Sequence, residues 1–365
     1  MIRMNEFSRD PETLRQAQVA AVERVLASGW YVLGPEVAAF ERQFAAVCGA
    51  QSAIGVANGM DAIEIALRAL DIGPGDEVIT TPMTAFATVL AVYRAGANPV
   101  LADIEADTAL LSIDSVRRCV TPRTRAVLLV HLYGHMARID DWKQFCESAK
   151  IWLIEDCAQA HLASSNGRVA GTIGVCGAYS FYPTKNLGTA GDGGALITQS
   201  APIAELSRAL RNYGQSERYL HPYRGLNSRL DEIHAAILSA RLEWLERFTA
   251  RRRQIAAAYR AGLNSAVVGL LAPPREAENH VYHLFVVCCQ RRDALAVHLK
   301  QSGVECFSHY PVPIHQQKSC AGIMKDPAGL PLSEAHSRTC LSLPCHHNMT
   351  DEQVENVIRA VNTFG

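Results

Sequence analysis

The sequence has no run of about 18 apolar residues, so it predicts no membrane-spanning helix. Its N-terminus, MIRMNEFSRDPETLRQ, is charged from the start and lacks the apolar segment of a signal peptide. Neither sign of charge is in excess, with 35 basic and 36 acidic side chains, so nucleic acid and anionic membranes are not expected partners. We therefore expect a cytosolic protein that acts on a small molecule.

Metal-binding patterns are also missing. The chain has 11 cysteines, an odd number, and no CxxC pair, so we expect reduced and mostly buried thiols. Several histidines lack the spacing of metal ligands and are expected to be hydrogen-bonded scaffold residues. They are His131, His135, His161, His346 and His347. The sequence therefore predicts no metal site.

Short apolar runs alternate with helical stretches along the first two thirds of the chain. Most of the runs are apolar on both faces, as in a mostly parallel sheet covered by helices. The expected strands are residues 77–82, 97–104, 126–134, 151–159, 178–183 and 193–198. Residues 60–72, which carry apolar side chains at helical spacing, are one expected connecting helix. The fold class is therefore α/β.

The pattern changes from residue 227 onward. There we expect one long helix with an apolar stripe, and we interpret Arg251, Arg252 and Arg253 as its solvated face. Beyond it, strands at 280–289 and 304–311 and helices at 292–303 and 350–361 indicate a smaller α+β domain. We place the boundary inside the long helix, giving a large domain over 1–245 and a small one over 246–365.

Lysine is scarce, with 6 in the chain, and Lys185 stands in the glycine-rich segment AYSFYPTKNLGTAGDGGALIT (178–198). A lysine that serves as a nucleophile is held beside a cofactor and partly desolvated, which lowers its pKa. Taken alone, the segment fits a structural loop equally well. A nucleoside-triphosphate loop is excluded because GxxxxGK[ST] is absent, and a dinucleotide loop because these glycines precede a strand.

Two further segments carry polar residues at the ends of expected strands. Glu155 and Asp156 end an apolar strand, where ligands bind in α/β sheets, and a buried anion such as Asp156 can keep a pyridine nitrogen protonated. We interpret Glu155 as a cap of the next helix. In ANGMDAIEIAL (57–67), Gly59 and Met60 open a helix whose N-terminal amides can bind a phosphate. An ordinary N-cap at Asn58 or Asp61 is the alternative.

An amine nucleophile, an acid for a pyridine nitrogen and a phosphate cradle together point to pyridoxal 5′-phosphate. The chain also resembles the nucleotide-sugar aminotransferases of the DegT/DnrJ/EryC1/StrS family, almost from end to end. The segments that carry the resemblance are SGWYVLGPEVAAFE (28–41), NGMDAIEIALRALDIGPGDEVI (58–79), VHLYGHMARID (130–140), EDCAQAH (155–161), SFYPTKNLGTAGDGGALIT (180–198), RNYGQ (211–215), GLNSRLDEIHAAIL (225–238), HYPVPIHQ (309–316) and LSLPCH (341–346).

The resemblance implies a fold type I transferase with pyridoxal 5′-phosphate bound in the large domain. It makes Lys185 the Schiff-base lysine and proton carrier, Asp156 the partner of the pyridine nitrogen, and Gln159 the partner of the ring hydroxyl. These three roles are carried over by position from the family's motifs.

The same resemblance places the phosphate on Ser180 and on the backbone of Gly59 and Met60. It also implies that Asn227 reaches this phosphate from the neighbouring subunit. A homodimer with shared active sites is therefore expected.

One position departs from the family pattern. Relatives commonly carry an aromatic residue that covers the cofactor ring in a segment resembling TPFTFFAT, whereas TPMTAFAT has Ala85 there. We expect Phe86 to face the other way, as successive strand residues do. Thr84, Met83 and Ala85 remain the candidates for covering the ring.

The resemblance also suggests where the sugar binds. His309 and Tyr310, in HYPVP, match a family segment near the substrate. Tyr182, Tyr219 and His221 resemble residues of the sugar 3-aminotransferases.

The implied reaction moves the amino group of glutamate to a keto group of a nucleotide-linked deoxysugar. The motifs favour a dTDP-3-keto-6-deoxyhexose over its 4-keto isomer. Three other functions stay open: a pyridoxal-phosphate dehydratase, which Lys185 disfavours because such relatives carry histidine there, a non-catalytic cofactor-binding regulator, and a phosphate-ligand binding domain without the cofactor.

Overall fold

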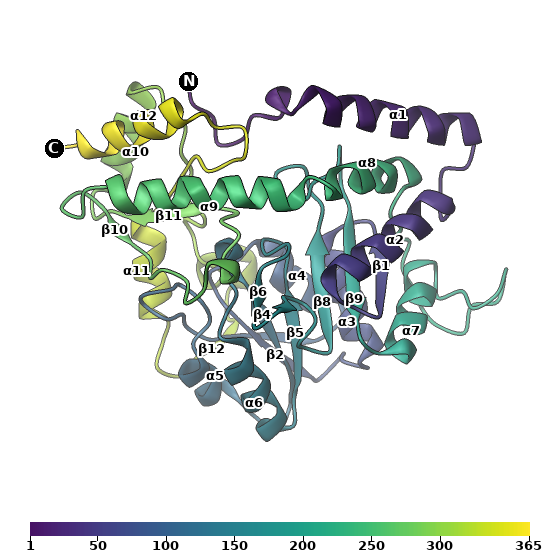
Figure 1. Ribbon diagram of the computed structural model, residues 1–365. Helices are drawn as coiled ribbons and strands as arrows, with labels where there is room; N and C mark the ends of the chain where they lie inside the picture. Colours follow the sequence, from purple (N-terminus) through teal and green to yellow (C-terminus); the bar gives the residue numbers. More distant parts are fainter.

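The computed structural model describes residues 1–365 and has a central eight-stranded sheet in the order β1-β9-β8-β5-β4-β2-β3-β12 (Figure 1). β9 alone runs opposite to the other strands, and every pair that does not include it is parallel. The strands are β1 (Ser52–Val56), β2 (Glu77–Thr80), β3 (Asn98–Leu101), β4 (Thr124–Val130), β5 (Trp152–Asp156), β8 (Cys176–Ser180), β9 (Gly194–Thr198) and β12 (Met324–Lys325). This arrangement confirms the α/β prediction and the six expected strands.

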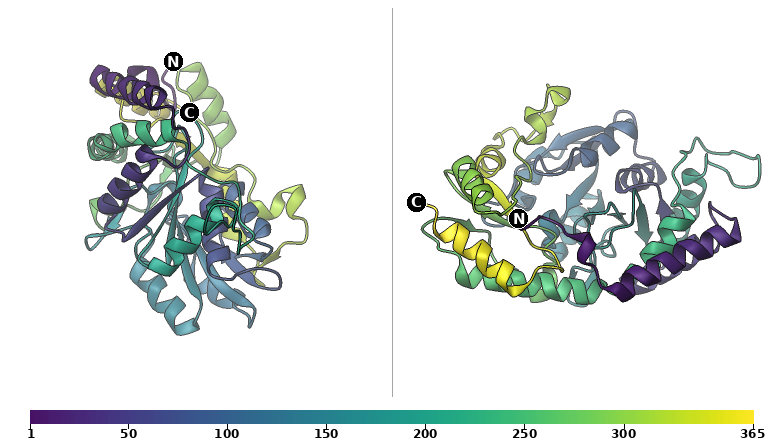
Figure 2. Two further views of the ribbon diagram at one scale, coloured as in Figure 1. Left: turned by 90° about the vertical axis from the view of Figure 1, so that its right-hand side faces the viewer. Right: turned by 90° about the horizontal axis from the view of Figure 1, so that it is seen from above.

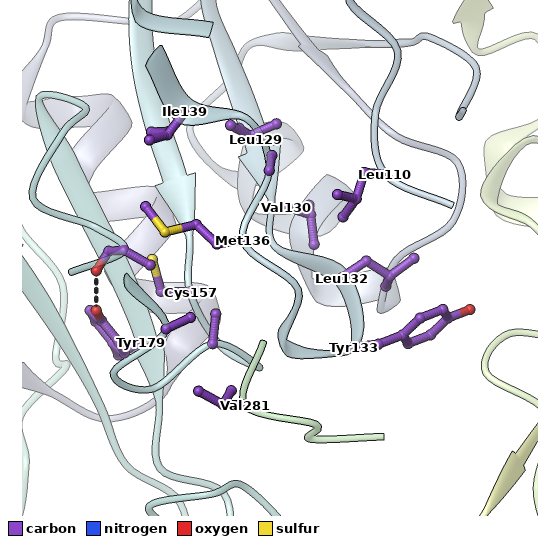
Figure 3. Close-up of a cluster of buried hydrophobic side chains, with 14 of the residues drawn as sticks. Leu110, Leu129, Val130, Leu132, Tyr133, Met136, Ile139, Cys157, Tyr179 and Val281 are labelled. Carbon is purple, nitrogen blue, oxygen red and sulfur yellow. Dashed lines mark hydrogen bonds between the residues drawn. The ribbon is translucent and has the colours of Figure 1, made fainter. Parts of the chain in front are cut away.

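Helices cover both faces of this sheet because its strands are apolar on both sides. One face packs against α3 (Gly59–Ala69), α4 (Phe86–Arg94) and α7 (Ala201–Arg211). The other packs against α2 (Pro35–Cys48), α5 (Ile113–Cys119), α6 (Ile139–Ala149) and α8 (Glu232–Leu242). Figure 3 shows part of the core between the sheet and this second set of helices. The N-terminal helix α1 (Glu12–Ser28) packs on α8.

The C-terminal part builds a second, smaller core. Its antiparallel sheet contains β10 (Gly269–Leu270), β11 (Phe285–Cys288) and β13 (Cys340–Leu343). Side chains from α9 (Leu245–Gly262), α10 (Arg292–Gln301) and α12 (Asp351–Asn362) pack against it, and α11 (Pro331–Thr339) precedes β13. A two-stranded hairpin, β6 (Ser164–Ser165) and β7 (Arg168–Val169), completes the strands. The domain boundary near residue 245 stays a prediction.

The cysteines are all free, and nine of the eleven are buried, which confirms the prediction of reduced thiols. No helix of the structure combines the length and the apolar character needed to cross a membrane.

The single long helix expected after residue 227 is wrong: α8 and α9 are separate helices. The N–H of Trp244 bonds the carbonyl of Arg241, three residues back, and this tighter turn divides the helical run. Arg252 is also not solvated. It is buried in α9, where its Nη1 donates to the carbonyls of Tyr282 and His283.

The strand expected at 304–311 is also wrong. Val304 and Phe307 form only isolated bridges, with Ile2 and Ser342. The prolines at the end of this segment supply no N–H for a strand ladder, so it continues as an irregular loop. The position beside β11 belongs instead to β13.

Candidate active site

Lys185 lies in the loop that joins β8 to β9. Backbone hydrogen bonds fold this loop on itself, from Phe181 N–H to the Gly193 carbonyl (2.7 Å) and from Lys185 N–H to the Tyr182 carbonyl (2.8 Å). Gly188 is required here, because a Cβ at this position would lie 2.5 Å from the Pro183 carbonyl oxygen. Burial lowers the pKa of the Lys185 amine to about 8, against the opposing effect of the Asp156 charge. Near neutral pH a useful fraction of this amine is therefore uncharged and nucleophilic.

Asp156 faces Lys185 from the C-terminal end of β5. Its carboxylate is buried and accepts hydrogen bonds from the Thr88 hydroxyl (3.0 Å) and the Ala158 N–H (3.1 Å). Burial raises the pKa of Asp156, while these two hydrogen bonds and the Lys185 charge oppose that shift. The sheet thus holds an acid opposite the amine, at the strand edge where α/β proteins bind ligands.

The N-terminus of α3 adjoins Ser180, the last residue of β8. A Cβ on Gly59 would come 2.8 Å from the Ser180 Cβ, so only glycine permits this approach. The Asn58 side chain accepts from the Asp61 N–H (2.9 Å), which confirms the N-cap, and leaves the amides of Gly59 and Met60 at the open end of the helix. The same turn can therefore be capped by Asn58 and still bind a phosphate through the amides of Gly59 and Met60.

A further group of side chains near Lys185 and Asp156 consists of Gln159, His309 and Tyr310. The Gln159 amide nitrogen donates to the Tyr310 hydroxyl (3.2 Å), and His309 Nδ1 pairs with the Ser342 hydroxyl (2.8 Å). Burial, with a smaller effect of the Asp156 charge, raises the pKa of Tyr310 to about 12. Burial, together with the Lys185 charge, lowers that of His309 to about 4. Both side chains are therefore neutral, and they lie close enough to the Lys185–Asp156 pair for its charges to affect their pKa values.

These groups fit pyridoxal 5′-phosphate. The site offers a partly neutral amine, a buried carboxylate, an amide donor on Gln159 with one N–H to spare, and a helix N-terminus beside a serine hydroxyl. Each matches one functional group of the cofactor: aldehyde, pyridine nitrogen, ring hydroxyl and phosphate.

The segment around Ala85 is not a strand, so the alternation expected for Phe86 is wrong. Ala85 is the N-cap of α4 and Phe86 its first residue, with a side chain that is exposed. The buried Thr84 hydroxyl bonds that of Thr88, which in turn holds Asp156. Thr88 could not be singled out beforehand, since a threonine in an apolar helix is ordinarily a packing residue.

Two other residues near Lys185 were missed. His283 is buried and pairs through Nδ1 with the Asn186 amide oxygen (3.3 Å), and Asn186 donates to the Val281 carbonyl (3.0 Å). Burial and the Lys185 charge keep the pKa of His283 well below its usual range. The position of Asn186 directly after the lysine was the one available signal.

Tyr219, His221 and Asn227 are not joined to this group within one chain. They lie on the segment that projects beyond α7 (Figures 1 and 2), where Tyr219 is 81% exposed. His221 pairs with the Tyr213 carbonyl, and Asn227 accepts from Arg229. Tyr182, in the Lys185 loop, is 52% exposed.

Glu155 does not cap a helix, so its interpretation as a cap is wrong. Its buried carboxylate accepts from the N–H groups of Gly171 (2.7 Å) and Gly174 (2.6 Å), among other donors, and so fixes the loop before β8. It also pairs with His131 Nε2 (2.9 Å), and His131 Nδ1 accepts from the Ala137 N–H. Although Cys157 brings a third potential ligand atom within 4.8 Å, these hydrogen bonds occupy the carboxylate and both imidazole nitrogens. We therefore interpret this cluster as structural.

Glu155→Gln is expected to destabilise the fold. The amide NH₂ of glutamine would face backbone donors and leave buried N–H groups unsatisfied, which costs about 3 kcal/mol in the free energy of unfolding. Chemical denaturation of the variant measures this loss, with the exposed Glu147→Gln as control. An unchanged unfolding midpoint for Glu155→Gln would contradict the structural role.

Comparisons with known proteins identify the family of this chain. A model of the DegT/DnrJ/EryC1/StrS aminotransferase family matches residues 12–362. The dTDP-3-amino-3,4,6-trideoxy-alpha-D-glucose transaminase of Streptomyces venezuelae is 45% identical, over 97% of this chain and 93% of the relative. The dTDP-3-amino-3,6-dideoxy-alpha-D-galactopyranose transaminase of Aneurinibacillus thermoaerophilus is 43% identical, over 94% of each.

The crystal structure of S. venezuelae DesV in complex with a ketimine intermediate has the same fold. Its TM-score is 0.94 at 44% identity, covering 99% of this chain and 97% of that one. This likeness confirms the predicted fold type. The crystal structure of NtdA from Bacillus subtilis with bound cofactor PMP, which has a TM-score of 0.85 at 28% identity and covers 96% of this chain and 82% of that one, confirms the cofactor class. The chain belongs to the DegT/DnrJ/EryC1/StrS aminotransferase family and is a pyridoxal-phosphate-dependent enzyme.

Proposed function

We propose that this enzyme transfers the amino group of glutamate to the C3 keto group of a dTDP-linked 6-deoxyhexose. The observation that carries the proposal is the likeness, over more than nine tenths of the chain, to two transaminases named for 3-amino sugars. The presence of Lys185 opposite Asp156 supports amino transfer over elimination of water.

Pyridoxal phosphate, when bound, supplies an electron-withdrawing ring and an aldehyde that exchanges amino groups. Lys185 holds the cofactor through its amine and moves one proton between cofactor and substrate carbon, first as a base and then as an acid. Asp156 keeps a proton on the pyridine nitrogen, and Thr88 orients that carboxylate. Gln159 donates to the ring hydroxyl.

Ser180 and the amides of Gly59 and Met60 bind the phosphate, where the open helix end favours an anion. Thr84, Met83 and Ala85 remain the candidates for covering the ring. The donors and the helix end fix where the cofactor lies relative to Lys185.

His309 and Tyr310, both neutral and close to the Lys185–Asp156 pair, bind the sugar part of the substrate. Tyr182, exposed on the Lys185 loop, lines the same entrance.

A homodimer with shared active sites completes the proposal. Tyr219 and His221 lie on the exposed segment that follows α7 (Figure 2), and Asn227 lies at the base of that segment, bridged to Asn212. We assign these three residues to the active site of a neighbouring subunit. Sedimentation at micromolar concentration tests this, and a monomer of full activity would contradict it. The cytosolic location stays a prediction.

The position of amination is tested with the purified enzyme, glutamate and each keto-sugar supplied separately. We expect a new amine at C3 of the 3-keto-6-deoxyhexose, located by NMR. The reason is geometric: a misplacement of about 1 Å can cost on the order of 100-fold in rate, so the 4-keto isomer is a poor substrate. An amine found only at C4 would overturn the position, and cofactor binding without amino transfer would favour the regulator.

A further inference from the structure

Tyr133 occupies the turn between β4 and α6 and is almost fully buried. Its φ of +62° lies in the left-handed region, which non-glycine residues adopt rarely, and Gly134 follows with φ +91°. A Cβ on Gly134 would lie 2.8 Å from the Gln159 carbonyl oxygen, so the turn is pressed against the segment that carries Gln159. Figure 3 shows the Tyr133 ring extending away from the labelled core side chains.

The backbone of Tyr133 fixes the orientation of Gln159. Its N–H donates to the Gln159 side-chain oxygen (2.6 Å). Because that oxygen is occupied, the amide nitrogen points the other way and donates to Tyr310. The turn thus sets which end of the amide faces the site.

The side chain of Tyr133 reaches the segment that contains His309. Its hydroxyl donates to the main-chain carbonyl of His309 and therefore accepts from His336 Nε2 (2.9 Å). His336 is then neutral, in agreement with burial that lowers its pKa to about 4, and its Nδ1 accepts from the Cys288 thiol (3.7 Å). The donors run in one direction, from Cys288 through His336 and Tyr133 to His309.

We propose that Tyr133 is a positioning residue that sets the sugar-binding segment His309–Tyr310 relative to Gln159, the partner of the cofactor's ring hydroxyl. One residue holds Gln159 through its N–H and the His309 carbonyl through its hydroxyl. The inference rests on the proposed function, in which this segment contacts the sugar. The Tyr133 hydroxyl supports only the sugar-binding segment, because Gln159 is held by the Tyr133 backbone N–H and not by its side chain.

Tyr133→Phe removes the hydroxyl and keeps the ring. In the holoenzyme we expect kcat/KM for the keto-sugar half-reaction to fall about tenfold, the effect of one buried hydrogen bond, and the glutamate half-reaction to change less than about twofold. Calorimetric binding of the dTDP-linked 3-amino-sugar product should weaken by the same factor. Stopped-flow spectra of the two half-reactions provide the rates.

Tyr259→Phe is the matched control. Tyr259 is also buried and donates to a main-chain carbonyl, that of Pro344 (2.7 Å), in the core of the C-terminal sheet. Tyr259→Phe should lower the free energy of unfolding about as much as Tyr133→Phe does, and the rates of both half-reactions should stay unchanged. His336→Leu removes the donor to the Tyr133 hydroxyl, together with the acceptor of the Cys288 thiol. It should weaken the sugar half-reaction about threefold and provides a second test if Tyr133→Phe folds poorly.

Two results would overturn this inference and leave the proposed function standing. One is an equal loss of rate in both half-reactions of Tyr133→Phe. The other is product binding by Tyr133→Phe that is as tight as binding by the wild type. A wild-type enzyme that binds no such product would overturn the proposed function and this inference with it.

Discussion

Lys185→Ala is expected to lower amino transfer by a factor on the order of 10³ while the fold remains intact. The substitution removes the only amine that the loop between β8 and β9 presents to Asp156, and with it both the attachment of the cofactor and the proton carrier. The loop itself is held by backbone hydrogen bonds that alanine preserves. The measurement is the glutamate-dependent rate, together with the thermal unfolding curve.

Lys143→Ala is the control for this variant, because Lys143 is exposed on α6 and pairs weakly with Glu147 (4.0 Å). It should retain wild-type activity. Loss of activity in both variants, or in neither, would show that the attachment of the cofactor has been assigned to the wrong lysine.

Asp156→Asn is expected to lower the rate on the order of 100-fold with little effect on stability. Asparagine keeps the shape: its oxygen can accept from the Ala158 N–H at the Oδ1 position, and its NH₂ group, in place of Oδ2, can donate to the Thr88 hydroxyl. It has no charge to keep the pyridine nitrogen protonated. The rates of both half-reactions should fall, because the ring needs that proton in each. Steady-state rates with saturating cofactor measure the loss.

The same variant should shift the pH dependence of the apoenzyme. The Asp156 charge raises the pKa of Lys185, which burial lowers to about 8, so its removal should lower that pKa further. Reconstitution with pyridoxal phosphate, which needs the neutral amine, should then reach its midpoint at a lower pH than in wild type. A midpoint that moves upward, or Asp156→Asn and Glu155→Gln enzymes that are equally active, would contradict the assignment of the carboxylate.

Much of the fold could be predicted from the sequence because its signals are local. Runs that are apolar on both faces identified the strands of the large sheet, and helical spacing identified α3, α10 and α12. The prediction of a strand at 304–311 was wrong. The apolar and aromatic residues of this segment resemble those of a strand, but its prolines have no N–H to donate to a strand ladder.

In the candidate site, too, some residues could be predicted from local signals and others could not. Lys185 and Asp156 could be singled out because each is chemically unusual in its segment, and the structure places them close enough for the charge of each to shift the pKa of the other. The pairing of Glu155 with the amides of Gly171 and Gly174 joins residues on different segments, and no periodicity of either segment reveals it. Arg252 is similar, since its carbonyl partners lie 30 residues or more away along the chain.

The most direct measurement is the identity of the lysine that bonds the cofactor. Holoenzyme reduced with borohydride, digested and mapped by mass spectrometry should carry the cofactor on the peptide that contains Lys185, with full occupancy and no label elsewhere. The chain has 6 lysines, so the alternatives are few and each is resolved by its own peptide. Label on any of the other five, or none on Lys185, would contradict the account.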